Sequence, residues 1–169
     1  EDQRLNKETE RDLQSIIVAV DPAVTSGSHS DETGIIVVGK DYNNHFYVLE
    51  DISGRHTADN WGRIVLNAYY EWEADRIIAE VNNGGDLVEK LIRDKDPNAS
   101  YRSVRATRGK MLRAEPIAAL YEQGRVHHMG VFGELEQQMC SYVGQLKPSP
   151  DRLDALVWGL TELSKSSGT

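Results

Sequence analysis

Short apolar runs rich in β-branched residues recur through the first two thirds of the chain, each bounded by polar or turn-forming residues. Runs of this length and composition predict buried strands rather than helices. They lie at residues 15–20, 34–38, 46–52, 76–80 and 101–106. The first three runs follow one another without an intervening helical pattern, which predicts an antiparallel meander.

Apolar residues three and four positions apart predict helices after the meander. The first such stripe consists of Trp61, Ile64, Val65, Ala68, Tyr69 and Trp72. Further helices are expected over residues 86–92, 112–123 and 135–142, with a short extension at residues 125–128. Pro116 must either bend the second of these helices or mark its true start.

The final helix has the strongest signals. Ser149 suits the N-cap position and Pro150 the first helical position. The apolar face of this helix consists of Leu153, Leu156, Val157, Leu160 and Leu163. The order of elements predicts an α/β fold with a mixed five-stranded sheet, in which two crossover strands extend the three-strand antiparallel meander and helices pack on both faces.

Three acidic residues stand where core-forming elements end or begin. Asp21 follows the first strand, Glu80 ends the fourth, and Asp154 lies in the first turns of the last helix, on the same face as Asp151. If the first and fourth strands are neighbours and the last helix crosses them, these carboxylates converge and repel one another unless a cation neutralises them. Hard oxygen ligands favour Mg²⁺, Mn²⁺ or Ca²⁺, and such a cluster suits phosphodiester hydrolysis by two metal ions.

Three of these acids also have a purely structural interpretation, whereas Asp154 lies too deep in the helix for a capping role. An aspartate before proline, such as Asp21, often forms a turn, and Glu80 can be a solvated charge at a strand end. Asp151 near a helix start stabilises the helix dipole without binding a ligand.

His127 and His128 are adjacent, so both cannot serve one metal site in a regular strand. The absence of a Cys/His cluster argues against zinc.

The distribution of charge changes the meaning of the net charge. The 169 residues include 27 acidic and 19 basic ones, a net charge of −8 that opposes bulk attraction to nucleic acid. Residues 101–128 nevertheless hold six basic residues against two acidic ones. Among them are Arg105, Arg108, Lys110 and Arg113, at or just after a predicted strand-to-helix junction. They can bind phosphates there, or form a solvated helix face.

The length favours a single domain. We expect residues 1–14, which are almost wholly polar, to be a linker remnant, residues 15–164 to form the domain, and residues 165–169 to be a flexible tail. The longest apolar run, residues 16–20, is far too short to cross a membrane. The single cysteine, Cys140, cannot form an intramolecular disulfide, and a reducing cytoplasm fits best.

Five phrases of the sequence resemble, in order, the C-terminal nuclease domain of phage terminase large subunits. They are residues 20–23 (VDPA), 31–35 (DETGI), 79–86 (AEVNNGGD), 113–116 (RAEP) and 149–158 (SPDRLDALVW). The resemblance implies a ribonuclease H-like fold and a metal-dependent endonuclease that cuts concatemeric viral DNA during genome packaging with two Mg²⁺ or Mn²⁺ ions. It implies that Asp21, Glu80 and Asp154 are catalytic metal ligands, with Asp151 as a further ligand.

The same resemblance implies partners. They are double-stranded DNA, an N-terminal ATPase domain of the parent chain, and the portal and small terminase subunit, all in the host cytoplasm and none in a membrane. Arg105, Arg108, Lys110 and Arg113 would then face the DNA. The spacing of Asp151 and Asp154 also resembles the terminal acid pair of Holliday-junction resolvases on the same fold.

Other functions remain open from sequence. A non-catalytic module that docks DNA or the portal would need the basic segment but no metal site, and a resolvase-type nuclease would share the acids. An actin-like nucleotide hydrolase would need glycine-rich phosphate loops after its early strands, and residues 23–33 contain just Gly27.

Overall fold

The structure, a computed structural model, describes residues 13–22, 33–55, 57–80, 85–105, 110–141 and 151–165. The strands are β1 (Leu13–Asp21), β2 (Gly34–Asp41), β3 (Phe46–Asp51), β4 (Arg76–Glu80), β5 (Tyr101–Val104) and β6 (Val126–His128). The helices are α2 (Ala58–Glu71), α3 (Gly85–Lys95), α4 (Lys110–Glu122), α5 (Gly133–Ser141) and α6 (Asp151–Lys165).

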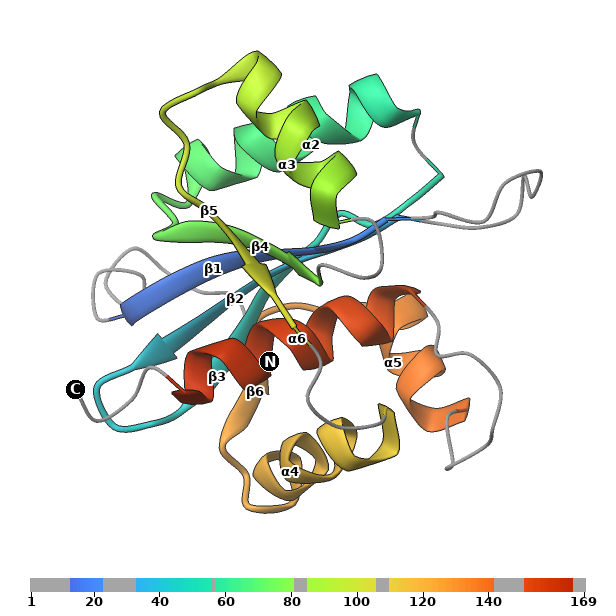
Figure 1. The fold of residues 1–169 in the computed structure, drawn as a ribbon. Coiled ribbons are helices and arrows are strands. Elements are labelled where there is room, and N and C mark those ends of the chain that lie inside the picture. The colour runs from blue at the N-terminus through green and yellow to red at the C-terminus, as the bar shows by residue number, and fades with distance from the viewer. Residues whose placement is uncertain are drawn as a thin grey trace.

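These strands form one mixed sheet in the order β5-β4-β1-β2-β3-β6 (Figure 1). β1, β2 and β3 pair antiparallel, which confirms the predicted meander. β4 pairs parallel with β1, and β5 pairs parallel with β4, so α2 and α3 are the crossover helices. The predicted α/β class and the two crossover strands are therefore confirmed.

The sheet contains one strand more than the five predicted. β6 pairs parallel with β3, in a register that runs from Phe46 opposite Val126 to Val48 opposite His128. The sequence alone predicts only a short extension at residues 125–128, because a strand of three residues is too short to show the alternation that marks a strand. The sixth strand changes the count but not the class of the fold.

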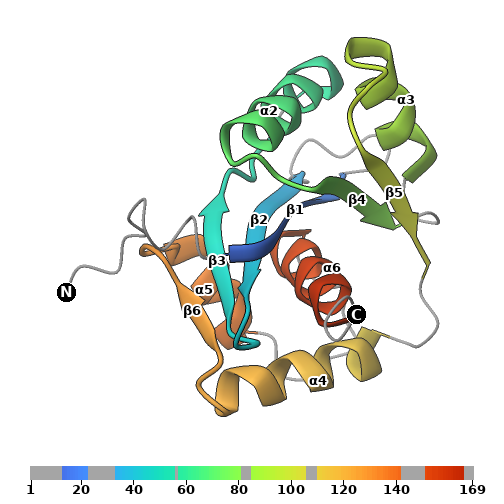
Figure 2. The same ribbon diagram turned by 90° about the vertical axis from the view of Figure 1, so that its left-hand side faces the viewer.

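Helices cover both faces of the sheet (Figure 2). Ile17 and Ala19 of β1 belong to the core beneath α6, whereas Val18 and Val20 belong to the opposite core with α2 and α3. This division follows from the pleat of the strand, which turns successive side chains to opposite faces. An unbroken apolar run in β1 is thus explained by a strand that is buried on both sides.

Helix α6 packs against the centre of the sheet, antiparallel to β1. Near its end, the Leu163 carbonyl accepts a 3.1 Å hydrogen bond from Nζ of Lys40, a fully buried residue that pairs with Ser15 at the start of β1. Further back, Gly159 lies so close to the sheet that an added Cβ would be 2.8 Å from Cγ2 of Val38. The first turn of α6 therefore lies toward the carboxyl end of β1.

Gly159→Ala is expected to destabilise the fold. The new methyl group would meet Val38 at 2.8 Å and Cβ of Ala19 at 3.3 Å, and overpacking of this kind costs about 1–3 kcal/mol. Gly133→Ala is the matched control, since a Cβ at Gly133 of α5 has no atom within 4 Å. Urea denaturation should show the difference, and equal free energies of unfolding for the two variants would contradict the close approach.

One of two predictions about helix boundaries is tested by the described residues. Pro116 lies inside α4, so it does not mark the start of that helix. Helix α6 begins at Asp151, and the predicted capping residues Ser149 and Pro150 lie outside the described residues. None of the helices that the structure describes is long and apolar enough to cross a membrane.

The two adjacent histidines of β6 have different environments, as predicted. His127 Nε2 lies 2.8 Å from Nδ1 of His45, and the two rings stack with their centroids 5.1 Å apart. His128 contacts the Tyr121 hydroxyl at 2.7 Å and a carboxylate oxygen of Glu136 at 2.9 Å. The histidines therefore join β6 to the start of β3 and to the flanking helices.

The His127 contact predicts acid sensitivity. Burial lowers the pKa of His127 below its usual value, and the neighbouring His45 lowers it further, while Asp41 has the opposite, smaller effect. The unfolded chain then binds more protons than the folded one below about pH 6.5, so stability is lost as the pH falls through that range. We expect His127→Gln to lose less stability than the parent between pH 7.5 and pH 5.5 in urea denaturation. An equal loss in both proteins would refute this role for His127.

Candidate active site

Asp21 and Glu80 end neighbouring parallel strands. β1 and β4 pair in a register that runs from Ile17 opposite Arg76 to Val20 opposite Ala79, so Asp21 and Glu80 are the next residues of the two strands. Parallel strands end at the same edge of a sheet, and residues side by side in register point to the same face. The sequence-based assumption that the first and fourth strands are neighbours is therefore confirmed.

Both acids lie on the α6 side of the sheet. Ala19 and Ile78, two residues before Asp21 and Glu80, belong to the core that α6 covers. The two-residue period of a strand places both carboxylates on that same face. Asp21 is only 3% exposed, and Glu80 is partly buried. Two carboxylate-bearing residues thus share one half-buried corner of the sheet.

Asp154 lies at the same end of the molecule. It is in the first turns of α6, the end of the helix that lies toward the carboxyl ends of β1 and β4 (Figure 1), and it is partly buried. It is five residues before Gly159, a rotation of about 140° around the helix, so the two residues face different directions. Asp151 is the first residue of α6, and its side chain is outside what the structure describes.

Among the side chains that the structure describes, no three from His, Cys, Asp and Glu are placed so that they could hold one metal ion. The fold thus brings Asp21 and Glu80 side by side and Asp154 to the same end of the core, without these three forming such a group.

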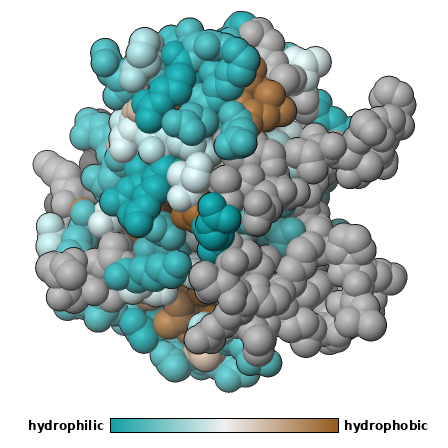
Figure 3. All heavy atoms as spheres, viewed as in Figure 1, coloured by the Kyte–Doolittle hydropathy of each residue, from teal (hydrophilic) through white to brown (hydrophobic). Residues whose placement is uncertain are grey.

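The predicted DNA-contacting residues lie beyond β5. Arg105 directly follows that strand and is exposed, whereas Arg108 is outside the described residues. Lys110 and Arg113 belong to the start of α4, whose first residue is Lys110; their side chains are not described. Figure 3 shows a mostly hydrophilic surface over the described residues of this view, with small apolar patches.

A buried cation that was not predicted from the sequence stands next to the acids. Arg152 stands between Asp151 and Asp154 and is only 5% exposed. Successive spacings of four, three and four residues place Arg152 on the same face of α6 as Leu156, Gly159 and Leu163. A basic residue at a position of the apolar face indicates a buried cation, and this pattern is visible in the sequence.

The sheet order, the parallel β1–β4 pair and the helices on both faces define a ribonuclease H-like fold. The chain belongs to the terminase RNaseH-like domain family, whose model matches residues 18–163. This family and the fold class are the ones that the sequence phrases predicted. No curated protein sequence matches the chain.

Three proteins are among those whose solved structures are similar to this chain in fold. A large terminase from a thermophilic bacteriophage has a TM-score of 0.66 and 13% identity over 90% of this chain and 40% of its own. The large terminase nuclease of thermophilic phage G20c, with bound zinc, has a TM-score of 0.64 and 12% identity over 87% of this chain and 81% of its own. RuvC of T. thermophilus, in complex with a Holliday junction, has a TM-score of 0.51 and 12% identity over 88% of this chain and 92% of its own. The chain spans about 40% of the first of these proteins, the large terminase.

Proposed function

We propose that this domain is a divalent-metal-dependent DNA endonuclease that cuts concatemeric viral DNA during genome packaging. The observation that carries the proposal is the placement of Asp21 and Glu80 side by side at the carboxyl ends of β1 and β4. Family membership supports the same function, since the similar solved proteins include a large terminase nuclease and a resolvase.

The residues at this corner fit a divalent cation. Both are carboxylates, and a carboxylate as buried as that of Asp21 is costly unless positive charge or hydrogen bonds compensate it. Oxygen donors of this type favour Mg²⁺ or Mn²⁺. Two such ions supply a water activated for attack and stabilisation of the leaving oxygen.

The four acids have different roles in the proposed site. Asp21 and Glu80 hold metal from the sheet, while Asp154 and Asp151 complete the ligand set from the first turns of α6. Both Asp151 and Asp154 lie in that part of the helix, so either can be tested by substitution.

The basic residues beyond β5 are the proposed DNA contacts. Arg105, Arg108, Lys110 and Arg113 would bind phosphate oxygens, as side chains of this type commonly do. Such contacts make DNA affinity fall steeply with salt concentration. The overall negative charge of the chain opposes bulk attraction to DNA, in contrast to the basic residues of this segment.

We propose that the parent protein also contains an N-terminal ATPase domain. The chain spans only 40% of the similar large terminase from a thermophilic bacteriophage, which supports a longer parent. In that setting the portal and small terminase subunit would be its partners, and the host cytoplasm its location.

Plasmid cleavage tests the proposed function. Supercoiled plasmid incubated with the domain should be nicked and linearised in Mg²⁺ or Mn²⁺ and left intact in excess chelator. Salt-sensitive DNA binding without cleavage under any metal condition would instead favour a non-catalytic docking module. Preference for a four-way junction over a linear duplex would favour a resolvase-type nuclease, to which the fold is also similar.

A further inference from the structure

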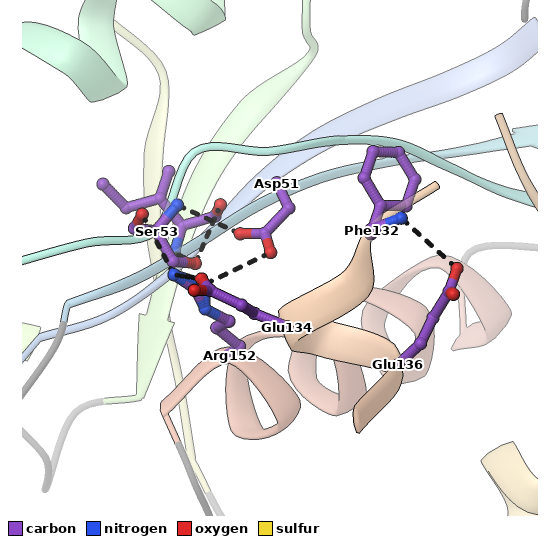
Figure 4. Close-up of polar contacts among 7 residues, drawn as sticks. Asp51, Ser53, Phe132, Glu134, Glu136 and Arg152 are labelled. Atoms are coloured by element: carbon purple, nitrogen blue, oxygen red, sulfur yellow. Dashed lines mark hydrogen bonds and ion pairs between the residues drawn. The ribbon is translucent and has the colours of Figure 1, made fainter. Parts of the chain in front are cut away.

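The first turn of α6 is tied to the sheet by the buried guanidinium of Arg152. Nη2 of Arg152 lies 2.7 Å from Oε1 of Glu134 in α5 and 3.4 Å from the Ser53 carbonyl oxygen (Figure 4). Nη1 lies 3.5 Å from Oδ2 of Asp51, the last residue of β3. The side chains of Arg152 and Asp51 are 7% and 8% exposed, whereas that of Glu134 is 75% exposed.

This network continues through the sheet to the strand that bears Asp21. Oδ1 of Asp51 accepts a 3.0 Å hydrogen bond from the Ser53 backbone N–H. The Ser53 hydroxyl in turn accepts a 2.8 Å hydrogen bond from the backbone N–H of Ile35. Ile35 is paired with Val20, the residue before Asp21. Arg152 thus connects the start of α6, through a short chain of polar contacts, to the carboxyl end of β1.

A buried arginine at position 152 can fix the direction of its contacts, which an apolar residue cannot do. Apolar burial has no directional preference, whereas a guanidinium fork binds carboxylate and carbonyl oxygens in defined directions. Buried ion pairs commonly add little or no stability relative to apolar residues of similar size. Removal of Arg152 alone would leave the buried Asp51 carboxylate without this cation and would cost stability, so the contribution of Arg152 that an apolar residue could not replace is to orientation.

We propose that Arg152, held by Asp51 and Glu134, is a positioning residue that sets the first turn of α6 relative to the strand ends bearing Asp21 and Glu80. This inference rests on the proposed metal-dependent function. Asp151 and Asp154 flank Arg152 in the same turn, so a shift or rotation of that turn moves both carboxylates together. Arg152 acts through these neighbours and does not itself touch metal or substrate.

The variants that test this role are Arg152→Met, Arg152→Lys and Asp51→Asn. The methionine variant removes the charge but keeps much of the side-chain volume, and the lysine variant keeps the charge but loses the fork. Asp51→Asn keeps an oxygen for the Ser53 N–H while removing the carboxylate. Lys40→Met is the matched control, because it removes a buried cation that holds the other end of α6 through the Leu163 carbonyl.

The decisive readout is the Mn²⁺ dissociation constant from titration calorimetry, measured together with the melting temperature in chelator. We expect Arg152→Met to weaken Mn²⁺ binding by about tenfold or more, with Arg152→Lys and Asp51→Asn in the same direction and a smaller effect. Lys40→Met should change the Mn²⁺ dissociation constant by less than about twofold, whatever it does to the melting temperature. If Arg152→Met does not fold, the other two variants decide the matter.

The possible results separate this inference from the proposed function. Parent-like Mn²⁺ affinity in the folded Arg152 variants overturns the positioning role and leaves the nuclease proposal intact. Equal weakening by Lys40→Met also overturns it, since the effect would then be general loosening of α6. A parent protein that neither binds Mn²⁺ nor cuts plasmid overturns the proposed function, and with it the positioning role.

Discussion

Asp21→Asn is expected to reduce metal-dependent plasmid cleavage by about a thousandfold while the domain stays folded. The substitution removes one negative charge from the strand end that lies beside Glu80. Metal ions contribute several kcal/mol to such reactions, and each 1.4 kcal/mol is about a tenfold change in rate. Asparagine has nearly the same shape as aspartate, and the backbone pairing of β1 does not depend on the carboxylate. Initial rates of supercoil loss in Mn²⁺ measure the effect.

Asp41→Asn is the matched control for this prediction. Asp41 also ends a strand, but β2 runs antiparallel to β1, so Asp41 lies at the opposite edge of the sheet. Its carboxylate accepts hydrogen bonds from the Tyr47 hydroxyl and from the backbone N–H groups of Asn43 and His45. We expect cleavage within about twofold of the parent. Comparable losses in the Asp21 and Asp41 variants would show that the location of the carboxylate is irrelevant.

Excess Mn²⁺ is expected to raise the melting temperature by about 5–10 °C over that in chelator. A ligand at 100 times its dissociation constant stabilises the folded state by about 2.7 kcal/mol, and for a chain of this size 1 kcal/mol corresponds to about 2–4 °C. The cation also removes the repulsion between Asp21 and Glu80, which is the physical source of the stabilisation. Differential scanning calorimetry in Mn²⁺ and in chelator provides the measurement.

Glu80→Gln should melt at nearly the same temperature with Mn²⁺ and with chelator. The glutamine variant isolates the strand-end site from general effects of the salt. An identical Mn²⁺-induced shift in the parent and in Glu80→Gln would mean that the ion binds elsewhere on the chain.

The sequence could predict the strands and the acids at their ends, because both depend on local patterns. The apolar run before Asp21 is long enough to identify a strand buried on both faces, and the run before Glu80 does the same for β4. The pairing of these two strands is decided by the tertiary fold and not by local patterns. From sequence, the two acids could therefore be placed together only on the assumption that their strands are neighbours. The register of β1 and β4 confirms that assumption.

The features that sequence could not supply depend on tertiary contacts. β6 is only three residues long and is a strand because β3 offers it an edge. The burial of Arg152 depends on Asp51, which is 101 residues away along the chain. The choice of the α6 face that carries Gly159 as the one against Val38 and Ala19 is likewise fixed by packing and not by the motif in which Asp154 stands.

We expect Asp21 and Glu80 together to bind the metal ion that the proposed endonuclease activity requires. Anomalous diffraction from crystals of the domain grown or soaked in Mn²⁺, at a concentration that supports plasmid cleavage, measures this binding. An anomalous peak is expected within coordination distance of both carboxylates, and no such peak in Asp21→Asn crystals treated in the same way. Mn²⁺ density bound elsewhere on the chain, with none between Asp21 and Glu80, would contradict this expectation.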